Sequence, residues 1–81
     1  MKESSTYQMI LREGREEGLK IGREEGRNEG RRNDVRSILR ARFGLVPVAL
    51  DAQLQATTDP VVLEAAVVAA ATAATVEDVT L

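Results

Sequence analysis

The side chains that could do chemistry in this sequence are carboxylates and arginines, which crowd its first half. Paired carboxylates can act as general acids and bases, and arginines can hold phosphates. The sequence has no histidine and no cysteine, so it lacks a neutral-pH base, a thiolate and the usual nitrogen and sulfur ligands of zinc. It also contains no glycine-rich phosphate-binding motif. We therefore expect no catalytic, metal-binding, cofactor-binding or small-molecule site, and no enzyme activity.

Arginines cluster between residues 31 and 42. Helical spacing would place Arg32, Arg36 and Arg40 on one face, and a parallel dimer would double that charge. Such a face could contact the phosphates of a nucleic acid. Acids lie nearby and no aromatic residues are interleaved, so a solvated helix face is the simpler interpretation and phosphate contact is the alternative.

The element that carries these charges has a glycine at every fourth place, in GREEGLKIGREEGRNEGRRND. Five glycines inside one helix cost about 5 kcal/mol relative to alanine. A flexible charged linker is one explanation, but a linker has no reason to keep this period. The period favours a helix whose missing side chains let a second backbone approach closely. The glycine ladder comprises Gly14, Gly18, Gly22, Gly26 and Gly30.

Acids flank one side of the glycine ladder and arginines flank the other. Opposite flanks meet when two copies pair in parallel, so only a parallel homodimer places glutamate against arginine. Leu19 and Ile21 interrupt the flanks at one level and would meet in register across this interface. A period of four also predicts a right-handed or closely crossing pair. The expected interchain ion pairs involve Glu13, Arg15, Glu17, Arg23, Glu25, Arg27, Glu29 and Arg31.

The remaining pattern predicts an all-α fold, because no segment alternates as a strand. We expect residues 1–5 to be disordered and residues 6–44 to form one long dimerisation helix that ends at Gly44. Val35, Ile38, Leu39, Arg42 and Phe43 would line one side of it. The candidate N-terminal caps are Ser4, Ser5 and Thr6.

Residues 45–81 predict a small cluster of two to three short helices. One covers residues 48–56 after Pro47, and another follows a cap at Thr58 or Asp59. Thr75 and Asp78 have capping-box spacing, which suggests a last helical turn over residues 76–81. The expected core comprises Phe43, Leu45, Val46, Leu50, Leu54, Leu63, Val67 and Val76.

Charge divides the chain into two unlike halves. All eleven lysines and arginines lie in residues 1–44, whereas residues 45–81 contain acids and no base. The longest weakly charged run, residues 60–76, is short for a membrane span and is typical of a core helix. We see no secretory signal, and the lack of cysteine fits a reducing compartment, so we expect a cytoplasmic protein without a membrane partner.

Three landmarks together are familiar: ESSTYQMILREGREEG, the central RARFG, and TTDPVVLEAAV before a final TVEDVTL. They resemble the C-terminal tail, a small domain of unknown function, of bacterial Rpn-type recombination-promoting nucleases and transposase-like proteins. The resemblance implies a PD-(D/E)XK nuclease core before the tail. Nothing in this sequence matches that core, so no catalytic residue is carried over. The resemblance also implies a bacterial source.

The sequence therefore predicts a non-catalytic homo-oligomerisation module whose partner is a second copy of the chain. A parallel homodimer is the simplest assembly, and a higher oligomer stays open. The alternatives are a segment that contacts nucleic-acid phosphates and a flexible charged linker.

Overall fold

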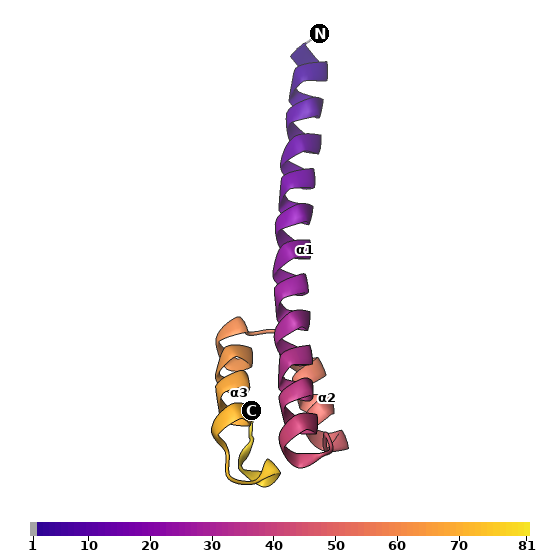
Figure 1. The fold of residues 1–81 in the computed structure, drawn as a ribbon. Coiled ribbons are helices and arrows are strands. Elements are labelled where there is room, and N and C mark those ends of the chain that lie inside the picture. Colours follow the sequence, from indigo (N-terminus) through magenta and orange to yellow (C-terminus); the bar gives the residue numbers. More distant parts are fainter. Residues whose placement is uncertain (1) are drawn as a thin grey trace.

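A computed structural model describes residues 2–81, and it describes side chains from Gln8 onward. Three helices follow one another: α1 (Lys2–Phe43), α2 (Val48–Ala56) and α3 (Pro60–Thr72), and a short 3-10 turn, η1 (Val76–Asp78), comes last. Helix α1 is a rod along most of the 65 Å length of the molecule, and α2 and α3 lie beside its C-terminal part only (Figure 1). The predicted all-α fold with one long N-terminal helix is confirmed.

The sequence predicted the C-terminal end of α1 more accurately than its N-terminal end. Helix α1 begins at Lys2, before the predicted start at residue 6. The candidate caps Ser4, Ser5 and Thr6 therefore lie within the helix rather than at its start, and the helical backbone described for residues 2–5 differs from the disorder predicted for residues 1–5. At the other end, Gly44 has a φ of 78° and its N–H donates to the Arg40 carbonyl at 3.0 Å. The predicted glycine terminus is therefore confirmed, because this left-handed conformation favours glycine.

The short helices begin where local chemistry predicts. Pro47 precedes α2, and its carbonyl accepts the N–H of Asp51 at 2.9 Å. The Asp59 carboxylate caps α3 by accepting the N–H of Val61 at 2.9 Å. Near the C-terminus the N–H of Thr75 donates to the Asp78 carboxylate at 3.3 Å. The helical turn that follows ends at Asp78, three residues before the predicted end.

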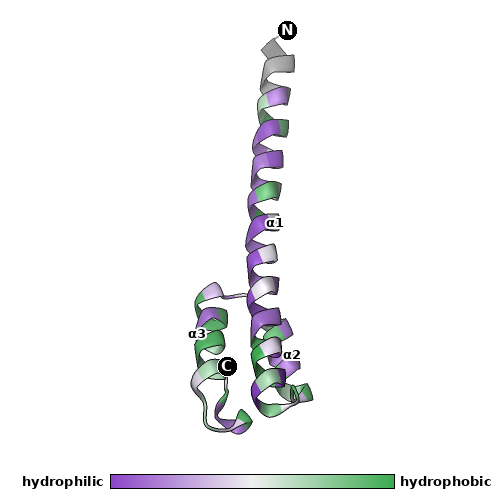
Figure 2. Ribbon diagram, viewed as in Figure 1, coloured by the Kyte–Doolittle hydropathy of each residue, from purple (hydrophilic) through white to green (hydrophobic). Residues whose placement is uncertain are grey.

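All three helices contribute to one small apolar core, together with Val79 from the C-terminal segment. Figure 2 shows α3 as mostly hydrophobic, whereas the projecting part of α1 is mostly hydrophilic. Apart from Val79, the buried apolar residues are Val35, Leu39, Leu50, Leu54, Leu63, Ala66 and Ala70.

The predicted core is largely confirmed. Of its eight members, Leu50, Leu54 and Leu63 are buried, and Phe43, Val46, Val67 and Val76 are partly buried against them. The prediction for Leu45 is wrong: this side chain is 52% exposed, because it lies in the surface connection between α1 and α2. Within residues 2–81 no helix is both long and apolar enough to cross a membrane.

Candidate self-association surface

Helix α1 has two parts with different surroundings. In the part that we call the free segment, residues 8–27, every side chain is exposed, and this part projects beyond α2 and α3 (Figure 1). In the part that we call the clasped segment, residues 28–43, Val35 and Leu39 are fully buried against the other helices. The candidate interface residues predicted from sequence fall mainly in the free segment.

No contact within the chain explains the glycine ladder. At each of the five positions, from Gly14 to Gly30, a Cβ atom would meet nothing within 4 Å. Their φ angles are also ordinary, since Gly44 is the one residue with positive φ among those described. Alanine would fit every position and would favour the helix by about 1 kcal/mol each. Within a single chain the glycines of the ladder therefore lower the stability of the helix, and no described contact offsets this loss.

Large apolar side chains accompany the ladder on the free segment. Leu19 is 58% exposed and Ile21 is 52% exposed, and they lie on either side of the glycines. Met9, Ile10 and Leu11 are also at least half exposed, one turn before Gly14. Single exposed apolar residues are common, but this group shares one short segment with the ladder.

The flanking charges of the free segment make no ion pair among the side chains that the structure describes, from residue 8 onward. Among the residues whose side chains are described, the ion pairs join Glu29, Arg32, Arg36 and Asp51 alone. Within residues 8–81, the predicted flank residues that make no ion pair are Glu13, Arg15, Glu17, Arg23, Glu25, Arg27 and Arg31.

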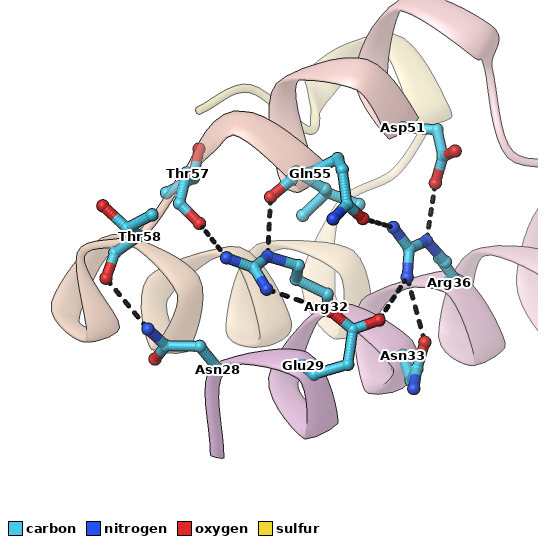
Figure 3. A network of polar contacts seen from close by, with 10 residues as sticks. Asn28, Glu29, Arg32, Asn33, Arg36, Asp51, Gln55, Thr57 and Thr58 are labelled. Carbon is cyan, nitrogen blue, oxygen red and sulfur yellow. Dashed lines mark hydrogen bonds and ion pairs between the residues drawn. The ribbon is translucent and has the colours of Figure 1, made fainter. Parts of the chain in front are cut away.

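Glu29 differs from these predicted interchain partners, because its carboxylate already binds within the chain. It accepts from Arg32 Nη1 at 3.0 Å and lies 3.5 Å from Arg36 Nη1 (Figure 3). An interchain ion pair through Glu29 would have to compete with both contacts. This places the C-terminal limit of the available acidic flank at Glu25.

Arg32 is buried and serves the fold. Its side chain is 4% exposed, and its Nε and Nη2 atoms donate to the carbonyls of Leu54 at 3.0 Å and Thr57 at 2.6 Å (Figure 3). The Leu54 carbonyl lies in the last turn of α2 and also accepts the N–H of Thr57 at 3.2 Å, and the Thr57 carbonyl directly follows the helix. Carbonyls at this end of a helix carry partial negative charge, which favours a cation. Arg32 therefore caps α2 from the side of α1.

Asn28 and Arg36 extend this arrangement, which we call the arginine clasp (Asn28, Arg32 and Arg36). Asn28 Nδ2 donates to the Thr58 carbonyl at 2.9 Å, and Arg36 Nε donates to Asp51 Oδ1 at 2.6 Å. The hydrogen bond to Asp51 raises the pKa of the Arg36 guanidinium; burial opposes this rise, while attraction by Asp51 and Glu29 adds to it. Arg36 is therefore held as a cation in the clasp.

The three arginines proposed for phosphate contact do not share one free face. Arg32 is buried on carbonyls and Arg36 is bound to Asp51, whereas Arg40 is exposed. Phosphate contact through the first two would require breaking the clasp.

Sequence reasoning missed the structural role of the clasp. Asn28 and Arg32 precede Val35 and Leu39 at spacings of four, three and four, so all four side chains lie on one helix face. This shared spacing was the available signal, but a polar residue on an apolar face does not identify its acceptor.

A shallow groove of about 390 Å³ lies where the free segment meets the α2–α3 connection. Acidic and basic side chains both line the groove, which spans the boundary between the free and the clasped segments of α1. The lining residues are Glu24, Glu25, Arg27, Asn28, Arg31, Thr58 and Pro60. Among the described residues, no group of three or more acidic, histidine or cysteine side chains has a geometry that could hold a metal ion.

Comparison with known proteins gave no match: no family model, no curated protein and no solved structure is similar to this chain. The resemblance to the tail of Rpn-type nucleases therefore stays a prediction.

Proposed function

We propose that this chain is a non-catalytic homodimerisation module in which two α1 helices pair in parallel through the glycine ladder. One observation carries the proposal: the free segment is a fully exposed helix, and neither its four glycines nor Gly30, the fifth glycine of the ladder, meets a neighbour within the described chain that requires glycine. A second helix close to the ladder would give those glycines a function, because backbone atoms could then make dispersion and Cα–H···O contacts.

The charges of the free segment support a second copy as the partner. The surface formed by the glycine ladder and its two flanks is self-complementary, since its acidic flank fits the basic flank of a parallel copy. Each exposed pair contributes only about 0.2–1 kcal/mol, so the flanks set direction more than strength. With Glu29 held in the clasp, the flank residues left to pair across the interface are Glu13, Arg15, Glu17, Arg23, Glu25, Arg27 and Arg31.

The apolar residues of the free segment supply register. In a parallel pair in register, Leu19 of one copy would meet Ile21 of the other, on both sides of the two-fold axis. Burying such a side chain is worth about 1.5–3 kcal/mol relative to full exposure, and both are now only half covered. These four side chains would therefore contribute more than the ion pairs.

The clasped segment and the short helices would form the rigid base of the pair. In a longer protein of the kind that the sequence resembles, the paired helices would hold two nuclease-like domains side by side in a bacterial cytoplasm.

The proposal is tested by the mass of the protein in solution, with two leucine substitutions as a matched pair. Gly22 lies on the ladder and Lys20 on the opposite face. We expect the wild-type chain and Lys20→Leu to have twice the 8.8 kDa chain mass in light scattering, and Gly22→Leu to be monomeric. A monomeric wild-type chain, or equal masses for the two variants, would refute pairing through the ladder.

Charge reversal tests whether the two flanks meet across the interface. One variant replaces the acids of one flank by arginine, and a second replaces the arginines of the other flank by glutamate. Each variant alone should fail to dimerise, because like charges then meet, and a mixture of the two should form heterodimers. Self-association of either variant would contradict pairing through the charged flanks. The exchanged positions are Glu13, Glu17 and Glu25 in the first variant, and Arg15, Arg23 and Arg27 in the second.

A further inference from the structure

We propose that the free segment is helical only while two chains are paired, whereas the clasped segment and the short helices fold within a single chain. This inference rests on the proposed pairing and adds a mechanism to it. Association would then be coupled to the ordering of residues 8–27, so the module would act as an order–disorder switch controlled by the concentration of chains.

The free segment lacks what normally stabilises a helix. It buries no side chain, and in proteins most of the stability of a helix comes from packing one face against other elements rather than from intrinsic propensity. Its favourable local features are the alternating charges at Arg12, Glu16, Lys20 and Glu24, spaced four apart. Three such pairs return less free energy than the glycines of the ladder take away.

The clasped segment has the opposite properties. Val35 and Leu39 are fully buried, and the clasp adds hydrogen bonds from α1 to carbonyls that follow or end α2. The N-terminal member of this set is Asn28, which binds the Thr58 carbonyl at 2.9 Å. The boundary between the persistent and the conditional helix should therefore lie at about residue 28.

The clasp also makes ordering on association easier. Helix formation is limited by its first turn, and the clasped segment supplies turns that are already formed. The free segment can then lengthen residue by residue from Asn28 when a second chain arrives. Because ordering opposes association, pairing should be weaker than the contacts alone would give.

The direct test is hydrogen exchange of the full chain at concentrations above and below its dimer dissociation constant. On dilution, the amides of Gly14, Gly18 and Gly22 should lose protection at least tenfold, while those of Leu39 and Leu63 keep theirs. Far-UV circular dichroism should show a parallel loss of helix. A chain that dissociates with unchanged protection in residues 8–27 would overturn this inference and leave the pairing intact; a chain that never pairs would overturn the proposed function.

A double variant, Gly18→Ala with Gly26→Ala, separates the two roles of the ladder. Alanine meets no atom at either position in the single chain and favours helix about fivefold at each. The diluted variant should therefore be more helical than the diluted wild-type chain, yet it should pair at least tenfold more weakly, because two methyl groups block close approach. The inference would be contradicted if the variant paired as tightly as the wild-type chain, or if the diluted variant were no more helical than the diluted wild-type chain. Lys20→Ala is the control and should pair normally.

Discussion

The two segments of α1 share one continuous backbone and differ in where their stabilising contacts come from. The clasped segment carries Val35 and Leu39, both fully buried by the rest of the chain. The free segment instead carries a glycine at every fourth position, together with the exposed side chains of Leu19 and Ile21. The clasped segment thus packs against other helices of the same chain, whereas the free segment packs against none of them. Helical backbone alone therefore does not identify a stable unit; the partner of each face does.

Arginine shows the same contrast in a single residue type. Arg32 is buried against the carbonyls at the end of α2, whereas Arg23, nine residues earlier, is exposed and makes one weak bond, to the Leu19 carbonyl at 3.4 Å. Removing the first guanidinium deletes two charged hydrogen bonds made by a buried side chain, while removing the second leaves only solvated groups. Equal substitutions in the two segments should therefore have unequal effects on the stability of a single chain.

The largest difference is expected for leucine truncation. Leu39→Ala should lower the free energy of unfolding by about 2–5 kcal/mol, because it leaves a cavity at a fully buried site. Leu19→Ala, at an exposed site, should change the stability of the single chain by less than about 0.5 kcal/mol and weaken pairing instead. Urea denaturation of dilute protein measures both. Similar losses for the two variants would show that the segments are not distinct.

A smaller but still large difference is expected for the arginines. Arg32→Leu should cost about 3 kcal/mol, since it removes two charged hydrogen bonds, to the carbonyls of Leu54 and Thr57. Arg40→Leu is the matched control on the same helix and should cost less than about 0.5 kcal/mol. The same denaturation experiment compares them, and an Arg32→Leu variant as stable as the control would remove the clasp from this account.

A cap substitution should have a moderate effect that is confined to the folded base. Asp59→Ala removes the acceptor for the Val61 N–H and should destabilise the short helices by about 1 kcal/mol. Asp59→Ser keeps an acceptor and should recover most of that loss. Neither change should alter the dimer dissociation constant by more than about twofold, and a larger change would mean that α3 takes part in pairing.

A small effect, of about the same size as that of the cap substitution, is expected from salt. The flank charges are exposed, so raising the salt concentration from 0.05 M to 0.5 M should weaken pairing by roughly three- to tenfold. The clasp is mostly shielded from water, so the unfolding free energy of the single chain should change much less. Sedimentation at the two salt concentrations measures the pairing, and an unchanged dissociation constant would remove the flanks as the source of direction.

Local chemistry explains which structural features were predictable. The terminus at Gly44 and the cap at Asp59 depend on residues adjacent in sequence, and both were predicted correctly. The roles of Arg32 and Asn28 were not, because their acceptors come from the end of α2 and the next connection, more than twenty residues away. Leu45 was wrongly placed in the core and Val79 was overlooked for a similar reason. Both are apolar residues outside the three helices, and hydrophobicity alone did not reveal which of them the helices would cover.

The glycine ladder lies between these cases. Its period could be recognised from sequence, and helix and exposure agree with the proposed surface. The partner itself requires an experiment, since the role proposed for the ladder and its flanks lies between chains.

The most direct test of parallel self-pairing is the distance between two spin labels. The chain contains no cysteine, so Gln8→Cys gives one labelling site on an exposed position of the free segment. A parallel dimer should give a single short distance, below about 25 Å. An antiparallel pair centred on Gly22 would separate the labels by about 42 Å, at 1.5 Å of rise per residue. The short distance is the predicted result, and the long distance or no dipolar coupling at all would contradict the account.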